Sequence, residues 1–160
     1  MADLKYVTYC GLYCKQCSNM TYIPQQAKAL YNTLKREGFE YFGPYGDEKF
    51  NDFWEYLKKL TQLDRVLEGC RKGGCGDPQC QIRMCASEKN QEICMYCEEY
   101  PCPKFDLLAT RYPTLLGEGK KLKEIGIDAW IEAQEERCSR GYCFADSRYD
   151  IDMEQEQKGD

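Results

Sequence analysis

Cysteine is the residue type in this chain of 160 residues that could do chemistry, with 12 copies. Seven of the cysteines fall in one stretch, with glycine and proline between them: Cys70, Cys75, Cys80, Cys85, Cys94, Cys97 and Cys102. Thiolates are soft ligands for Zn²⁺ and for iron–sulfur clusters, and the glycines allow the backbone to wrap around an ion. The stretch therefore predicts a metal-organising centre.

Two pairs have the Cys-x2-Cys spacing, at which a tight turn presents two thiolates to one ion. They are Cys14 with Cys17, and Cys94 with Cys97. Cys10 precedes the first pair and makes it a trio. Because a closed site takes four ligands, we expect the fourth ligand of this trio from residues 94–102.

The last two cysteines, Cys138 and Cys143, stand well beyond the central stretch. They are either buried thiols or ligands that complete a further site. The total of 12 favours ligation, because it divides into three sites of four. We expect the C-terminal helical segment to return to the cysteine centre and complete a site there.

The sequence contains no histidine, so a zinc site must be built from cysteine or borrow a carboxylate, and a histidine-based catalytic triad is excluded. The first residues lack the pattern of a secretion signal, which favours the reducing cytoplasm. Cysteines there serve as metal ligands rather than in disulfides, although a disulfide framework and unligated thiols stay open as alternatives.

The formal net charge of −5 argues against nucleic acid as a partner, because phosphate binding needs a basic surface. No run of residues reaches the roughly 18 apolar positions that a membrane span needs. We therefore expect no membrane association. A protein partner stays open and unidentified.

The fold class predicted by the periodicity is mainly α, a small single domain of short helices stapled by all-cysteine sites in loop-rich knuckles. Apolar residues recur at helical spacing over residues 24–37, 47–67 and 81–90, and in segments between 103 and 141, whereas 38–48 read as a loop. We expect one metal-binding domain over residues 1–150 and a disordered acidic tail over 151–160. The positions expected to be buried after residue 103 are Leu107, Leu108, Leu115, Leu116, Leu122, Ile125, Trp130 and Ile131.

The cysteine arrangement resembles a prokaryotic family catalogued as domain of unknown function 3795. The resemblance rests on YCGLYCKQC near the start, CQIRMCASEKN, CMYCEEYPCPKFD and, more weakly, WIEAQEERCSRG. The family is regarded as zinc-binding and has no assigned activity. The cysteines that this resemblance carries over are Cys10, Cys14, Cys17, Cys80, Cys85, Cys94, Cys97 and Cys102. At CRKGGC, which holds Cys70 and Cys75, the family has a closer Cys-x-Gly-Cys pair.

The leading hypothesis is a small zinc-binding module with structural four-cysteine sites that acts through interaction or regulation. The alternative is an iron–sulfur protein that carries or senses electrons, since the same thiolates bind clusters. Arg71, Lys72 and Arg83 lie among the cysteines and are expected to compensate the negative charge of a metal–thiolate group. The sequence favours a non-catalytic role but leaves catalysis open, because only carboxylates could act as general bases.

Overall fold

The computed structural model describes residues 3–73 and 76–147. Within these ranges the chain is helical, with one isolated antiparallel bridge between Val7 and Tyr13, which confirms the mainly α prediction. The chain forms two compact units, one made by 1–17 with 68–160 and the other by 18–67. All 12 cysteines belong to the first unit, and residues 18–67 contain none. Whether both units belong to one cooperative domain over 1–150 stays a prediction.

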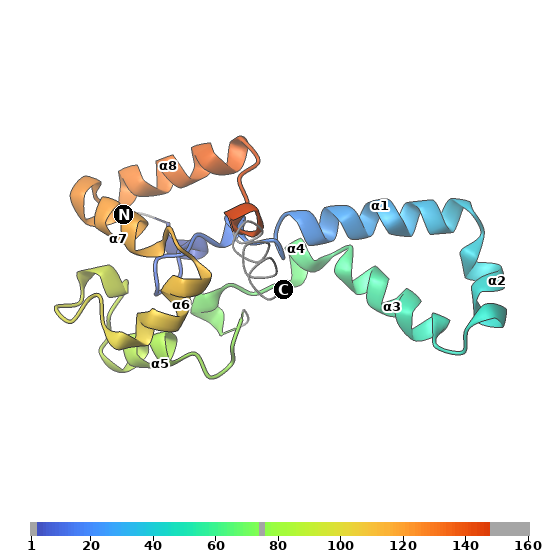
Figure 1. The fold of residues 1–160 in the computed structure, drawn as a ribbon, viewed down its shortest axis with the longest axis horizontal. Helices are drawn as coiled ribbons and strands as arrows, with labels where there is room; N and C mark the ends of the chain where they lie inside the picture. Colours follow the sequence, from blue (N-terminus) through green and yellow to red (C-terminus); the bar gives the residue numbers. More distant parts are fainter. Residues whose placement is uncertain (1–2, 74–75, 148–160) are drawn as a thin grey trace, which may run out of the picture. The chain divides into compact units, whose positions relative to one another are not determined.

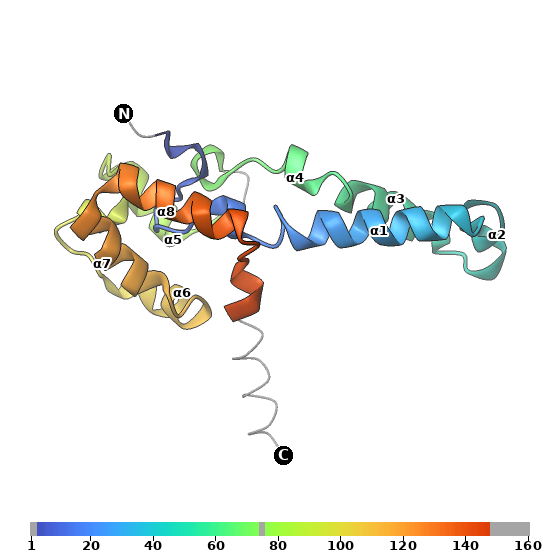
Figure 2. The same cartoon turned by 90° about the horizontal axis from the view of Figure 1, so that it is seen from above.

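The cysteine-free unit is a helical hairpin. Its helices are α1 (Tyr22–Arg36), α2 (Phe39–Gly46), α3 (Phe50–Leu60) and α4 (Leu63–Val66). Figures 1 and 2 both show α1 beside α3, with α2 at the turn between them. Ala27, Trp54 and Leu57 form the buried centre of this hairpin. The helical periodicity of the sequence therefore located α1 and α3 correctly.

Two sequence predictions in the hairpin are wrong at their details. The sequence predicts a loop over residues 38–48, but α2 forms there, and its Gly43 packs against the Phe50 ring so closely that an added Cβ would clash with it. The single helix expected over 47–67 ends at Leu60 and resumes as α4. At the break the Thr61 hydroxyl donates to the Lys58 carbonyl at 2.7 Å, which competes with continuation of the helix.

The cysteine-containing unit begins with two 3₁₀ helices, η1 (Leu4–Tyr6) and η2 (Cys14–Gln16), and continues with η3 (Cys70–Lys72). It then contains α5 (Gln81–Glu88), η4 (Cys94–Tyr96) and η5 (Pro103–Phe105). The last helices of the unit are α6 (Asp106–Arg111), α7 (Leu115–Ile125) and α8 (Ile127–Ser139) (Figure 1). Segments from every part of this unit share one core, made by Val7, Cys10, Tyr13, Ile82, Ile93, Met95, Phe105, Leu115, Leu122 and Trp130.

A partly buried carboxylate joins α7 to α8. Glu118 accepts hydrogen bonds from Trp130 Nε1 at 3.1 Å, Gln134 Nε2 at 2.9 Å and Arg137 at 2.8 Å. Three donors to one carboxylate satisfy its charge and lock the two helices in register. These bonds therefore hold α7 and α8 together as a pair.

Burial in this helix pair confirms part of the sequence prediction. Leu115, Leu122 and Trp130 are buried, whereas Leu107 is 85% exposed and Leu116 and Ile125 are also exposed. The error at Leu107 has a local cause: α6 has only six residues, and Phe105 just before it takes the buried position instead. The acidic tail expected over 151–160 lies outside the described residues.

Candidate metal centre

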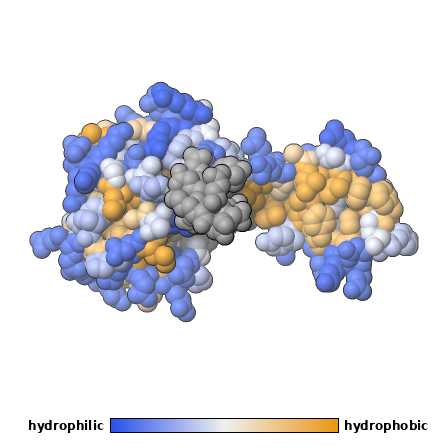
Figure 3. All heavy atoms as spheres, in the orientation of Figure 1, coloured by the Kyte–Doolittle hydropathy of each residue, from blue (hydrophilic) through white to orange (hydrophobic). Residues whose placement is uncertain are grey.

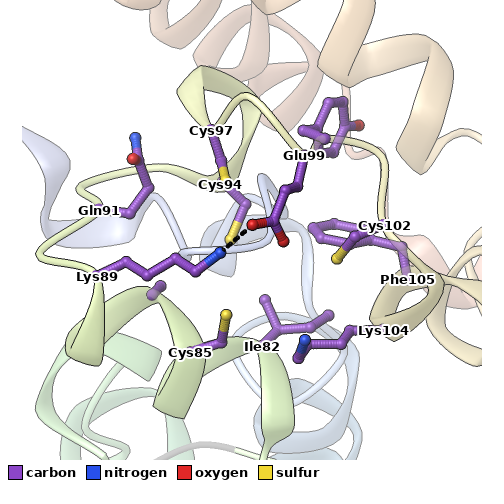
Figure 4. A pocket seen from close by; sticks show the side chains of 12 residues that line it. Ile82, Cys85, Lys89, Gln91, Cys94, Cys97, Glu99, Cys102, Lys104 and Phe105 are labelled. Carbon is purple, nitrogen blue, oxygen red and sulfur yellow. Dashed lines mark hydrogen bonds and ion pairs between the residues drawn. The ribbon is translucent and has the colours of Figure 1, made fainter.

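Four cysteines of the central stretch line one pocket. Cys85 comes from α5, Cys94 and Cys97 from the η4 turn, and Cys102 from the residue before η5. Figure 4 shows the four side chains around a common space, with sulfur atoms directed toward it. The cavity among them measures about 20 Å³, which is room for one water-sized occupant. Among the described cysteines, these four line one common pocket.

The two Cys-x2-Cys pairs have the same backbone fold. Cys17 N donates to Cys14 O at 3.0 Å, and Cys97 N donates to Cys94 O at 2.9 Å, so each pair closes a 3₁₀ turn. The second cysteine of each has nearly identical dihedral angles, φ −77° and ψ 138° at Cys17 and φ −75° and ψ 140° at Cys97. The repeated turn is the knuckle that the spacing predicted.

Burial protonates the thiols at the centre of the unit. The pKa of Cys94 is raised to about 12, first by burial and then by the neighbouring thiols of Cys10, Cys102, Cys85 and Cys97. Burial likewise raises the pKa of Cys10 to about 11, although a 3.1 Å contact with the Thr8 hydroxyl lowers it in part. A metal ion must therefore displace protons from these sulfurs to bind.

Two lysines that the sequence analysis did not single out, Lys89 and Lys104, line the pocket. Lys89 Nζ lies 2.6 Å from Glu99 Oε1, and both side chains line the pocket with Lys104 (Figure 4). The thiols of Cys85 and Cys97 contribute to the raised pKa of Lys89, after the dominant hydrogen bond to Glu99. Lys89 follows Cys85 by four residues at the end of α5, so helical spacing could have identified it.

Arg71 and Arg83, in the cysteine stretch, donate hydrogen bonds to backbone carbonyls. Arg71 donates to the carbonyls of Leu4 at 3.1 Å, Val7 at 2.7 Å and Glu92 at 2.9 Å. Arg83 donates to two carbonyls of the loop before α5, at 2.9 and 2.6 Å. Arg71 thereby fastens the Cys10 segment to the segment that precedes Cys94. Their expected role as charge compensation stays a prediction.

The cysteines of the N-terminal trio, Cys10, Cys14 and Cys17, do not all have the same neighbours. Cys10 is an electrostatic neighbour of Cys94, as the expected link to residues 94–102 requires, and also of Cys70 and Cys80. Cys14 lies elsewhere, with its Sγ 3.9 Å from where a Cβ on Gly69 would stand. Whether the trio shares one ion stays a prediction. Cys75 lies outside the described residues.

The C-terminal helix does return to the cysteine region, at the first knuckle. Lys15 Nζ lies 2.6 Å from Glu135 Oε1, the Tyr13 hydroxyl donates to the same carboxylate, and Gln16 Nε2 donates to Gln134 Oε1 at 2.9 Å.

These contacts place Cys138 beside the first knuckle, where burial raises its pKa and Gln16 hydrogen-bonds its sulfur. Cys143 follows α8 and is completely buried. That the two complete a metal site stays a prediction.

In residues 3–73 and 76–147, no three Cys, Asp or Glu side chains converge closely enough to hold a metal ion as they stand, and no cysteine forms a disulfide. The pocket nevertheless fits Zn²⁺ in its donor chemistry, because four soft thiols from three short segments line it. Ligation would require the sulfurs to draw together, to Zn–S distances of about 2.3 Å.

Comparison with known proteins gives a family and no function. No curated protein and no solved structure matches the chain. No helix among the described residues is long and apolar enough to cross a membrane. The family model described as "Protein of unknown function (DUF3795)" matches residues 6–107, which is more than half of the chain, and the protein belongs to this family.

Proposed function

We propose that the protein is a zinc-binding module in which Cys85, Cys94, Cys97 and Cys102 form a closed structural site. The observation that carries this proposal is the single pocket that these four side chains line. Four thiolates leave Zn²⁺ no open position for water, so the role of the site is to hold α5, the η4 turn and η5 together. The module then acts through its surface, in interaction or regulation, in the cytoplasm.

Charge supports this assignment. A four-thiolate Zn²⁺ site has a net charge of about −2. Lys89 and Lys104 lie at the same pocket, and Lys89 already neighbours two of the four thiols. Their ammonium groups oppose the negative charge that would otherwise accumulate at a partly buried site.

Cysteine spacing favours zinc over a cluster. The cysteine runs do not match the C-x2-C-x2-C-x3-C-P pattern of ferredoxins. The absorbance spectrum of anaerobically purified protein tests this choice. We expect a colourless protein that contains zinc. Sulfide-to-iron charge-transfer bands together with acid-labile sulfide would instead show that the protein binds an iron–sulfur cluster.

Metal content of cysteine variants tests the site itself. Cys94→Ser or Cys97→Ser should lose one equivalent of zinc by mass spectrometry of the folded protein. Tyr96→Ser, in the same turn and half-exposed, is the matched control and should keep the metal. Cobalt substitution adds a spectroscopic count, because thiolate-to-cobalt absorption weakens with each sulfur removed. Full metal content in both cysteine variants would refute this ligand set.

A further inference from the structure

The cysteine-free hairpin over residues 18–67 has a large apolar surface. Figure 3 shows hydrophobic side chains gathered across the hairpin, between two hydrophilic edges. The exposed large apolar and aromatic residues of this unit are Leu30, Tyr41, Phe42, Tyr45, Phe53, Tyr56 and Val66. A patch of this kind on a surface rimmed by charge indicates a protein interface.

The hairpin is one helix layer thick, which explains why the surface stays exposed. Its buried centre consists of only Ala27, Trp54 and Leu57. Two packed helices bury one stripe of side chains each. A second layer of helices is needed to cover the apolar side chains outside those stripes. On α3, Phe53 and Tyr56 are exposed beside the buried Trp54 and Leu57, whereas Leu60 packs against the buried centre.

Charge favours a second copy of this chain as the occupant of this surface. Residues 18–67 contain seven basic and seven acidic side chains, so the whole net charge of −5 lies outside the hairpin. Two hairpins can therefore approach without net repulsion, unlike two copies of the cysteine-containing unit.

The charges of α3 are also ordered along its length. Asp52 lies in its first turn, and Lys58 and Lys59 lie in its last turn. Asp52 and Lys59 fall on either side of Tyr56, four residues before it and three after it. A second α3 laid antiparallel about a two-fold axis near Tyr56 places Asp52 of each copy against Lys59 of the other.

We propose that residues 18–67 form a homodimerisation module, in which two hairpins pack their apolar faces antiparallel into a four-helix bundle. The interface is isologous, so one surface serves both copies. Phe53 and Tyr56, 45% and 62% exposed, lie at its centre, and α1 contributes Leu30. The proposal is independent of the metal site, because the hairpin contains no cysteine.

Sedimentation equilibrium of the full-length protein tests the association. We expect a concentration-dependent shift from 18.7 kDa to twice that mass. The double variant Phe53→Glu, Tyr56→Glu should weaken the dimer by at least about 30-fold, as loss of a central anchor does. Leu107→Glu, at an 85% exposed leucine of α6, is the matched control and should leave the dimer intact. A monomer at every concentration overturns the proposal and assigns the surface to another partner.

A charge exchange tests the antiparallel arrangement without touching the apolar residues. Asp52→Lys in one chain and Lys59→Glu in another each reverse one exposed charge of the proposed pair. Each variant alone should dimerise more weakly than the natural chain, and an equimolar mixture should recover a heterodimer. Circular dichroism verifies that both fold. Failure of the folded mixture to associate better than either variant would overturn the antiparallel pairing.

Discussion

The substitution Gly119→Ala in α7 tests how closely this helix packs against the residues that line the cysteine pocket. An added Cβ would stand 2.2 Å from the Tyr100 hydroxyl oxygen, 3.0 Å from Tyr100 Cζ and 3.3 Å from Met95 Cε. The Tyr100 ring cannot easily turn aside, because it packs edge-on against Phe105 at 5.1 Å between ring centres and lines the pocket. Gly119→Ala therefore overfills a packed contact.

Gly117, two residues earlier in the same helix, is the matched control, since no atom lies within 4 Å of its added Cβ. Both changes gain the helix propensity of alanine over glycine, about 1 kcal/mol. Their difference isolates the clash, which should cost ~1–3 kcal/mol. We expect Gly117→Ala to stabilise the protein and Gly119→Ala to be less stable than it by that amount.

Urea unfolding at fixed metal loading measures the difference. With a slope of about 1–3 kcal/mol per M, the midpoints of the two variants should differ by about 1 M. Gly119→Ala should also lower zinc affinity, because displacement of Tyr100 disturbs the pocket. Equal stabilisation by the two substitutions would refute the reasoning, since it would show that Tyr100 and Met95 yield without cost.

Three further outcomes are expected. Glu135→Gln should lower stability at neutral pH by about 0–1 kcal/mol, because the half-exposed pair with Lys15 is screened. The pKa of the Glu135 carboxyl is held below 4.5, chiefly by Lys15, so the stabilisation exists above that value and is lost as pH falls through the folded pKa. The denaturation midpoints of the natural protein and of Glu135→Gln should therefore converge in acid. A difference that stays constant with pH would contradict the ion pair. Trp54→Ala should cost ~3–5 kcal/mol in the hairpin yet leave metal content unchanged, which circular dichroism and metal analysis check against Trp54→Phe. Zinc affinity should rise with pH, because thiols such as Cys94, with a pKa of about 12, must release protons to bind the ion. Calorimetry in buffers of different ionisation enthalpy counts the protons released. A pH-independent affinity would argue against thiolate ligation.

Local sequence patterns were sufficient to predict two helices of the hairpin and the two cysteine knuckles. The spacing of apolar residues identified α1 and α3, and the two Cys-x2-Cys pairs fold as the same turn. Such features depend on residues within a few positions of one another, so periodicity and spacing determine them. The family could be recognised for the same reason, since its cysteine motifs are short and local.

Only the tertiary structure decided which of these local pieces meet. It separated the cysteine-free hairpin from the unit that holds every cysteine, and it brought Cys85, Cys94, Cys97 and Cys102 to one pocket. It also placed Lys89 there. The physical reason is that 12 cysteines of similar chemistry permit many groupings of four, and the choice depends on how distant segments share one buried core.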